Sequence, residues 1–168
     1  DAVFGIYPAN SNNEFVNIEG HEFDFPRQLV DKGPDKINYS LADFISPDQD
    51  WIGMFAVTTG KGIEDVISEF EKDHDDYRII MIKAIADRLA EAFAEKLHQM
   101  IRVDYWGYST EKNMTIEKLI KEKYIGIRPA PGYPACPSHE EKDKIWRILD
   151  VEKEVGITLT ESRAMYPV

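Results

Sequence analysis

The feature that most constrains the fold is the segment 75–102, in which apolar side chains recur every three or four residues. Because this spacing matches the period of an α-helix, the segment predicts one long helix with an apolar face packed in the core. The preceding segment, 62–74, has the same period, so two consecutive helices are predicted. The predicted core face of the longer helix consists of Ile82, Ile85, Leu89, Phe93, Leu97 and Met100.

Strand patterns lie mainly before these helices. Residues 3–7 and 14–18 predict a hairpin that turns over 10–13, where asparagine and serine gather. The continuous apolar run 51–57 predicts a strand in the centre of the sheet, and the aromatic segment 103–108 predicts another strand. Since strands and helices are segregated rather than alternating, the sequence predicts an α+β fold, with helices packed on a twisted, largely antiparallel sheet.

The C-terminal third carries signals for helix ends. Residues 115–123 predict a short helix, and Ser138 with Glu141 predicts a capping box at the start of another. Asp150 is expected to cap a last short helix that Gly156 ends. No internal repeat or linker interrupts the chain, so residues 1–168 are expected to form one domain.

Composition excludes several classes of function. Apolar residues make up 43% and charged residues 30%, which is typical of a globular protein. The chain has no apolar run that could span a membrane and no signal-peptide start, which predicts a cytoplasmic protein without a membrane partner. The net charge of -11 repels phosphates and argues against nucleic acid. The single cysteine, Cys136, excludes an internal disulfide and a cysteine-based metal cage.

A proline-rich loop over 128–137 is the candidate binding element. Each proline fixes φ near -65° and biases the preceding residue toward extended geometry, so the loop is stiff before a ligand arrives. A stiff loop loses less entropy on binding, and its missing N–H groups are expected to leave unpaired carbonyl acceptors for a cationic, amine-bearing ligand. The prolines are Pro129, Pro131, Pro134 and Pro137.

Other residues of the loop suggest the chemistry of that ligand. Arg128 presents a planar fork that can bind a carboxylate through two hydrogen bonds. Gly132 permits close backbone approach, and Tyr133 offers a stacking surface. One amino-acid-like nucleotide would satisfy all three residues. The residue types equally allow a surface connection in which Arg128 pairs with a neighbouring glutamate.

The string 126–137 resembles the S-adenosylmethionine-binding motif of the activation domain of cobalamin-dependent methionine synthase. Further segments resemble that family in the same order, so the resemblance covers nearly the whole chain. They are residues 41–44, 53–58, 74–77, 86–95, 105–108 and 159–162.

This resemblance implies a C-shaped α+β domain that holds S-adenosylmethionine in a shallow groove facing the cobalamin-binding module of the same enzyme. It implies no catalytic side chain and no metal ion in this domain. The residues implied for the ligand site are Arg128 for its carboxylate, Ala130 and Gly132 through backbone groups, Tyr133, and Glu91 and Glu122 as nearby carboxylates.

The two glutamates can also be judged from the residues themselves. Asp87, Glu91 and Glu95 form an acidic stripe at i, i+4 spacing that points away from the predicted apolar face. Such a stripe is ordinarily a solvated helix face. Glu122 lies at the end of a predicted helix, where its charge opposes the helix dipole. A ligand ammonium or Arg128 could compensate that charge.

The function that the resemblance implies is reactivation of an enzyme that transfers methyl groups from methyltetrahydrofolate to homocysteine. S-adenosylmethionine and a flavodoxin-type electron donor would serve the reductive methylation of cob(II)alamin. A non-catalytic interaction module that kept the fold but lost the ligand is the main alternative. A free-standing methyltransferase is disfavoured, because the chain lacks a nucleotide-binding βαβ unit.

Two further expectations concern completeness and metal binding. The chain starts and ends inside the family's domain, which is expected to weaken the ligand site and to prevent turnover by residues 1–168 alone. Cys136 and His139 have the spacing of half a zinc site, but no second pair completes it.

Overall fold

A long antiparallel hairpin organises the fold. The computed structural model describes residues 1–168 except 31–32, 34–35, 113 and 168. In chain order the elements are β1 (Ala2–Asn12), β2 (Phe15–Ile18), β3 (His21–Asp24), the 3-10 helix η1 (Leu41–Phe44), β4 (Asp50–Val57), α1 (Ile63–Lys72), α2 (Asp76–Met100), the π-helix η2 (Ile101–Tyr105), α3 (Ile116–Ile120), α4 (Glu141–Leu149), α5 (Val151–Val155), β5 (Thr158–Leu159) and β6 (Met165–Tyr166).

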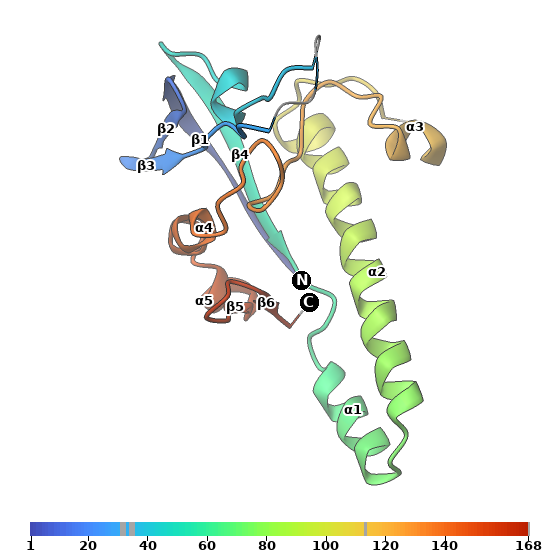
Figure 1. Ribbon diagram of the computed structural model, residues 1–168. Coiled ribbons are helices and arrows are strands. Elements are labelled where there is room, and N and C mark those ends of the chain that lie inside the picture. The colour runs from blue at the N-terminus through green and yellow to red at the C-terminus, as the bar shows by residue number, and fades with distance from the viewer. Residues whose placement is uncertain (31–32, 34–35, 113, 168) are drawn as a thin grey trace.

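The main sheet is antiparallel throughout, with strand order β3-β2-β1-β4 (Figure 1). The predicted first hairpin is confirmed, with Asn12 of β1 opposite Phe15 of β2. The turn is tighter than the polar run suggested, because β1 continues to Asn12 and Asn13 takes a φ of +56°. Asparagine tolerates that left-handed conformation better than most residues.

The prediction that 51–57 lies in the centre of the sheet is wrong. These residues form β4, which is the edge strand of the described sheet, while β1 is central. Its continuous apolar run reflects cover on both faces. Met54 and Ala56 are buried in the core on one face, and on the other Trp106 lies where a Cβ on Gly53 would be 3.3 Å away. An apolar run reports what covers the faces of a strand, not how many strands flank it.

The core lies between the sheet and the helices α4 and α5. Trp146 is fixed there by a 2.8 Å hydrogen bond from its Nε1 to the carbonyl of Ile157. Burying each large apolar side chain contributes about 1.5–3 kcal/mol before entropy is counted. The buried residues of this cluster are Ala9, Val16, Ile18, Phe23, Phe25, Ala42, Met54, Ala56, Cys136, Leu149, Val151, Val155 and Ile157.

Helix α2 exists as predicted, but its buried face was predicted wrongly. Ala86, Ala90 and Leu97 are buried, whereas Ile85 is 51% and Leu89 54% exposed. Alanine lets the helix axis approach β4 closely, and the larger side chains then point outward. Of the predicted core face Leu97 is confirmed, while Ile82, Phe93 and Met100 are half-buried.

The predicted strand 103–108 is also wrong. The chain instead continues α2 as the π-helix η2, in which the Trp106 N–H donates to the carbonyl of Ile101 at 2.8 Å. The aromatic residues reach the sheet from this helix, since the Tyr105 ring lies 4.8 Å from that of Phe4. The aromatic residues therefore indicated contact with the sheet rather than strand structure, and Tyr105 makes that contact while 55% exposed.

Helix ends follow local chemistry with two corrections. One is Asp150, which precedes α5 in a left-handed conformation with a φ of +50° and makes no side-chain capping hydrogen bond. The Asp75 side chain caps α2 by accepting from the Arg78 N–H at 3.0 Å, and Gly156 ends α5 at a φ of +75° as predicted. The predicted capping box of Ser138 and Glu141 does not form. The Glu141 carboxylate bonds Lys144 at 2.8 Å instead, because Glu141 is buried on the first turn of α4.

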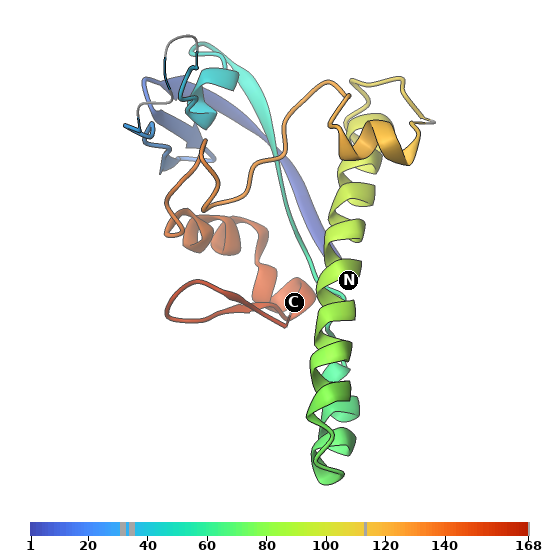
Figure 2. The same cartoon turned by 45° about the vertical axis from the view of Figure 1, so that its right-hand side comes forward.

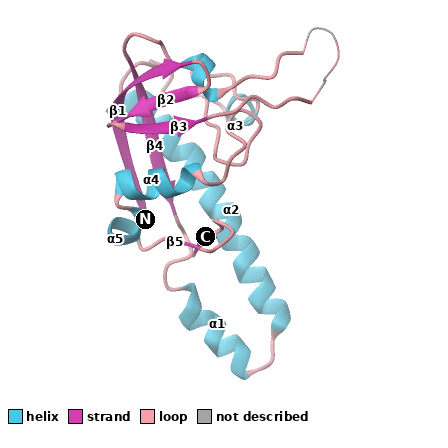
Figure 3. Ribbon diagram, turned by 60° about the vertical axis from the view of Figure 1, so that its left-hand side comes forward, coloured by secondary structure: helices cyan, strands magenta, loops and turns pink. Residues whose placement is uncertain are grey.

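These elements confirm the α+β prediction and give the chain a C-shaped outline. Helix α2 runs along one side, and α4, α5 and the β5–β6 pair lie on the other (Figures 2 and 3). The segment that follows α3 crosses from the end of α2 toward α4 (Figure 2). No helix in the described part of the chain is long and apolar enough to cross a membrane.

Candidate functional site

The head of the proline-rich loop is anchored on the C-terminal end of α2. The Arg102 guanidinium lies 3.8 Å from the centre of the Tyr124 ring, which is a cation–π contact. Two residues later Gly126 passes close to Tyr108 and Arg102 with a φ of +109°. Arg128 then donates from Nη2 to Glu95 Oε2 at 3.2 Å. These contacts fix the segment before the first proline.

Arg102 is the most buried charge at this anchor, with 1% of its surface exposed. Its Nη1 lies 2.5 Å from His98 Nδ1. Because an arginine stays protonated and can only donate, His98 Nδ1 must accept, which leaves the imidazole neutral with its proton on Nε2. Burial lowers the pKa of His98 to about 3, and the charges of Arg102 and Arg128 add to this effect.

Glu95 is the acidic member of the same cluster. Its side chain is 24% exposed, and Oε1 is buried without a hydrogen-bond partner in the described structure. Helical spacing places Glu95, His98 and Arg102 on one side of α2 and its π-helical extension. Burial raises the pKa of Tyr124, with the Glu95 charge as the next cause. Glu95, His98, Arg102, Tyr124 and Arg128 are called the α2 anchor below.

The loop beyond Arg128 folds back on itself. The Tyr133 N–H donates to the Ala130 carbonyl at 2.9 Å, and the Gly132 N–H donates to the Cys136 carbonyl at 2.8 Å. The carbonyls of Tyr133 and Ala135 also accept backbone hydrogen bonds. The expectation of unpaired carbonyl acceptors is therefore wrong for these four residues. Three of the carbonyls are paired within the turn, and that of Ala135 accepts from the Leu41 N–H at 2.8 Å.

Cys136 stabilises this turn rather than offering a nucleophile. The buried thiol donates from Sγ to the Ala130 carbonyl at 2.9 Å. Burial raises the pKa of Cys136 to about 11, so the unreactive thiol form predominates at neutral pH. The described residues contain no group of three or more potential metal ligands, so nothing there completes a zinc site with Cys136 and His139.

Gly132 and Tyr133 stand at the tip of the turn. Gly132 has a φ of +107°, and a Cβ there would lie 2.3 Å from Cε1 of His139. Only glycine therefore fits both the backbone conformation and the space. The side chain of Tyr133 projects from a residue that is 61% exposed, which leaves its ring accessible for stacking.

In the described structure, neither of the two carried-over glutamates forms an ion pair with Arg128. Glu91 has a 78% exposed side chain and lies 3.7 Å from Arg88, not from Arg128. Glu122 is exposed at the end of α3 with a φ of +49°, and its charge contributes to the raised pKa of Tyr124. The carboxylate that meets Arg128 is Glu95, which the sequence showed only as the last member of an acidic stripe. The sequence feature that could have pointed to Glu95 is its helical spacing to His98 and Arg102, which places the three residues on one side of the helix.

Comparison with known proteins places the chain in a family. The model of the vitamin B12-dependent methionine synthase activation domain matches residues 1–168. The chain belongs to the methionine synthase activation-domain family. Among solved structures, the MetH reactivation domain bound to AdoHcy is 48% identical, with a TM-score of 0.90 over 99% of this chain. The chain spans only 55% of the length of that relative.

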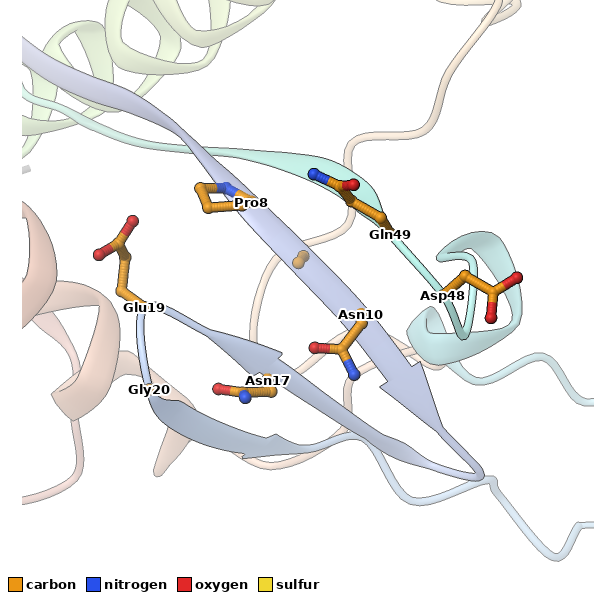
Figure 4. A pocket seen from close by; sticks show the side chains of 8 residues that line it. Pro8, Asn10, Asn17, Glu19, Gly20, Asp48 and Gln49 are labelled. Atoms are coloured by element: carbon orange, nitrogen blue, oxygen red, sulfur yellow. The ribbon is translucent and has the colours of Figure 1, made fainter.

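Two hollows on this activation domain lie away from the loop 128–137. One of about 400 Å³ lies over β1 and β2 and is lined by polar side chains such as Asn10, Asn17 and Asp48 (Figure 4). The other, of about 540 Å³, lies against α1 and α2 and is mainly apolar, with Phe70 and Met81 in its lining. Neither hollow is lined by a residue of the loop.

Gly126→Ala is expected to destabilise the activation domain by about 1–3 kcal/mol, mainly through its backbone conformation. The added Cβ would sit 2.6 Å from the Tyr108 hydroxyl in a backbone conformation that disfavours side chains. Gly20→Ala is the matched control, since Gly20 has a φ of +76° but nothing within 4 Å of the added Cβ. Urea denaturation should show the larger loss for Gly126→Ala. Equal losses would contradict the close approach of Gly126 to Tyr108.

Proposed function

We propose that this chain binds S-adenosylmethionine at the loop 128–137 and positions it for the reductive methylation of cob(II)alamin held by another module of a methionine synthase. The observation that carries the proposal is Arg128. Its guanidinium stands at the head of the loop, with Glu95 as its hydrogen-bond partner in the described structure. Since the fork has further N–H groups, it can bind Glu95 and a ligand carboxylate together.

The other parts of the ligand have matching partners on the same loop. The exposed ring of Tyr133 suits stacking on a purine. Gly132 leaves the tip of the turn without a side chain, which suits close approach of a ligand to the backbone around Ala130 and Gly132. Glu91 and Glu122 supply exposed negative charge for the ammonium and sulfonium groups, in a chain of net charge -11.

The role of the chain would be positioning rather than acid–base catalysis. When bound, S-adenosylmethionine supplies an activated methyl group, and transfer of a sulfonium methyl needs no general base. The other residues of the α2 anchor would hold Arg128 in place. Arg128 would then orient the ligand by binding the ligand carboxylate. The relative's AdoHcy supports this proposal, because S-adenosylhomocysteine is what remains of S-adenosylmethionine after methyl transfer.

The wider reaction is part of the same proposal. The complete enzyme would move methyl groups from methyltetrahydrofolate to homocysteine through cobalamin in the cytoplasm. A flavodoxin-type protein would supply the electron for reactivation. We expect residues 1–168 alone to bind the ligand without turning over, because this chain supplies neither the cobalamin site nor the electron.

Calorimetric titration tests the proposal directly. The chain is titrated with S-adenosylmethionine, S-adenosylhomocysteine, adenosine and methionine. We expect one site for each of the first two ligands and much weaker binding of the two fragments, since the whole ligand engages both Arg128 and Tyr133. A chain that is folded by circular dichroism but binds none of the four ligands would refute the proposal.

The alternative of a non-catalytic interaction module has one observation in its favour. Helix α2 exposes large apolar side chains outside the loop region. Exposed apolar patches often mark protein contacts. A folded chain that gave no ligand heat but formed a defined complex with another protein would favour this alternative. These side chains belong to Tyr77, Ile80, Met81, Ile85 and Leu89.

A further inference from the structure

We infer that Glu95 is a positioning residue, which holds the Arg128 guanidinium in the orientation that receives the carboxylate of the ligand. The inference rests on the proposed function and adds a residue to its site. Glu95 lies outside the ligand-binding string 126–137, on α2, 33 positions before Arg128, and the resemblance assigns it no role at the ligand site. The contact between them joins the helix to the loop.

The pair is partly shielded from water, which makes it more than a surface ion pair. The side chains are 32% exposed for Arg128 and 24% for Glu95, and the atoms Nη2 and Oε2 are 3.2 Å apart. The second carboxylate oxygen of Glu95 is buried without a partner. A carboxylate with one buried, unpaired oxygen is costly to keep charged unless a cation lies beside it. Arg128 is that cation.

The charges around the pair explain why Arg128 needs a fixed partner. Arg102 is buried, and the charges of Arg102 and Arg128 both lower the pKa of His98. In the described part of the chain, no carboxylate forms an ion pair with Arg102, and Glu95 alone does so with Arg128. Without Glu95, Arg128 would lose the ion pair that ties it to α2.

Orientation matters because a guanidinium binds a carboxylate best through two parallel N–H bonds in one plane. An arginine that is already held loses less rotamer entropy when the ligand arrives. Glu95 sits on a rigid helix, so it can set that plane while other N–H groups of Arg128 face the ligand. A competing role makes the opposite prediction. If Glu95 competed with the ligand for Arg128, then Glu95 would weaken ligand binding.

The test compares two ligands on variants of the full chain. Dissociation constants are measured for S-adenosylmethionine and for its decarboxylated analogue. The constant of the analogue divided by that of S-adenosylmethionine is the ratio that measures how strongly Arg128 selects the carboxylate. Glu95→Ala is expected to lower this ratio by about three- to tenfold. Glu95→Gln keeps an acceptor for Arg128 and should stay within about twofold of the wild type. Asp87→Ala, in the same acidic stripe but two turns away, should leave the ratio unchanged.

A general structural role of Glu95 would weaken both ligands equally and leave the ratio unmoved, which would overturn the inference. A rise in S-adenosylmethionine affinity in Glu95→Ala would overturn it in favour of competition. Glu95→Asp keeps the charge but withdraws it by one methylene group. It should lower the ratio in the same direction, and it replaces Glu95→Ala if that variant does not fold. Failure of the wild type to bind either ligand would instead refute the proposed function.

Discussion

Replacement of Arg128 by alanine is expected to weaken S-adenosylmethionine binding by about 2–4 kcal/mol, or roughly 30- to 1000-fold. The substitution removes the charged partner of the ligand carboxylate and leaves that carboxylate partly desolvated beside the loop. It also breaks the contact with Glu95, so the head of the loop loses one of its attachments to α2. Isothermal titration calorimetry of the two proteins measures the difference.

A matched control separates this effect from the general loss of an arginine. The exposed fraction of the side chain is 31% for Arg163 and 32% for Arg128. Arg163 lies outside the proline-rich loop and pairs with Asp143 at 2.9 Å. Arg163→Ala should therefore bind S-adenosylmethionine as the wild type does. Equal affinity of Arg128→Ala and the wild type would show that the ligand carboxylate binds elsewhere.

Acidification is expected to destabilise the chain through His98, by about 3 kcal/mol between pH 7 and pH 4. The pKa of His98 falls from 6.5 to about 3 in the folded state, because burial and two arginines oppose its charge. Below pH 6.5 the unfolded chain therefore takes up a proton that the folded chain refuses. The free energy of unfolding then decreases as pH falls, and the decrease ends near pH 3. Above pH 6.5 His98 adds no pH dependence.

The variant His98→Asn isolates this contribution. An asparagine side chain can accept from Arg102 through its oxygen but does not take up a proton in this range. Urea denaturation from pH 7 to pH 4 should show a shallower loss for His98→Asn than for the wild type. The other ionisable groups of the α2 anchor, Glu95, Arg102, Tyr124 and Arg128, are common to both proteins and cancel in the difference. Parallel curves would contradict a neutral, buried His98.

Local patterns in the sequence located most helices and strands, because periodicity and capping act over a few residues. Helix α2 and the first hairpin follow directly from such patterns. The orientation of α2 did not, because Ala86 and Ala90 carry a weak apolar signal yet lie on its buried face. Large side chains such as Leu89 dominate a periodicity even when they face solvent.

The residues of the candidate site likewise fall into those that the sequence predicted and those that only the structure shows. Arg128, Gly132 and Tyr133 were predicted because together they suit one amino-acid-like nucleotide, and because their loop resembles a ligand-binding motif. Glu95 could not be singled out, since contact with Arg128 depends on how the loop crosses α2. The buried oxygen of Glu95 and the buried charge of Arg102 are properties of packing, and no single segment of sequence carries them.

The π-helical turn at Ile101–Tyr105 has a consequence for how the chain tolerates changes in length. Each residue of an α-helix turns the direction of its side chain by about 100°, and a π turn adds one residue to a single turn. That extra residue lets one unbroken helix direct Arg102 toward the loop and Tyr105 toward the sheet. Removing any one residue of this turn would rotate either Arg102 away from Tyr124 or Tyr105 away from Phe4. The number of residues in this turn is thus as much a determinant of the candidate site as the identity of Arg128.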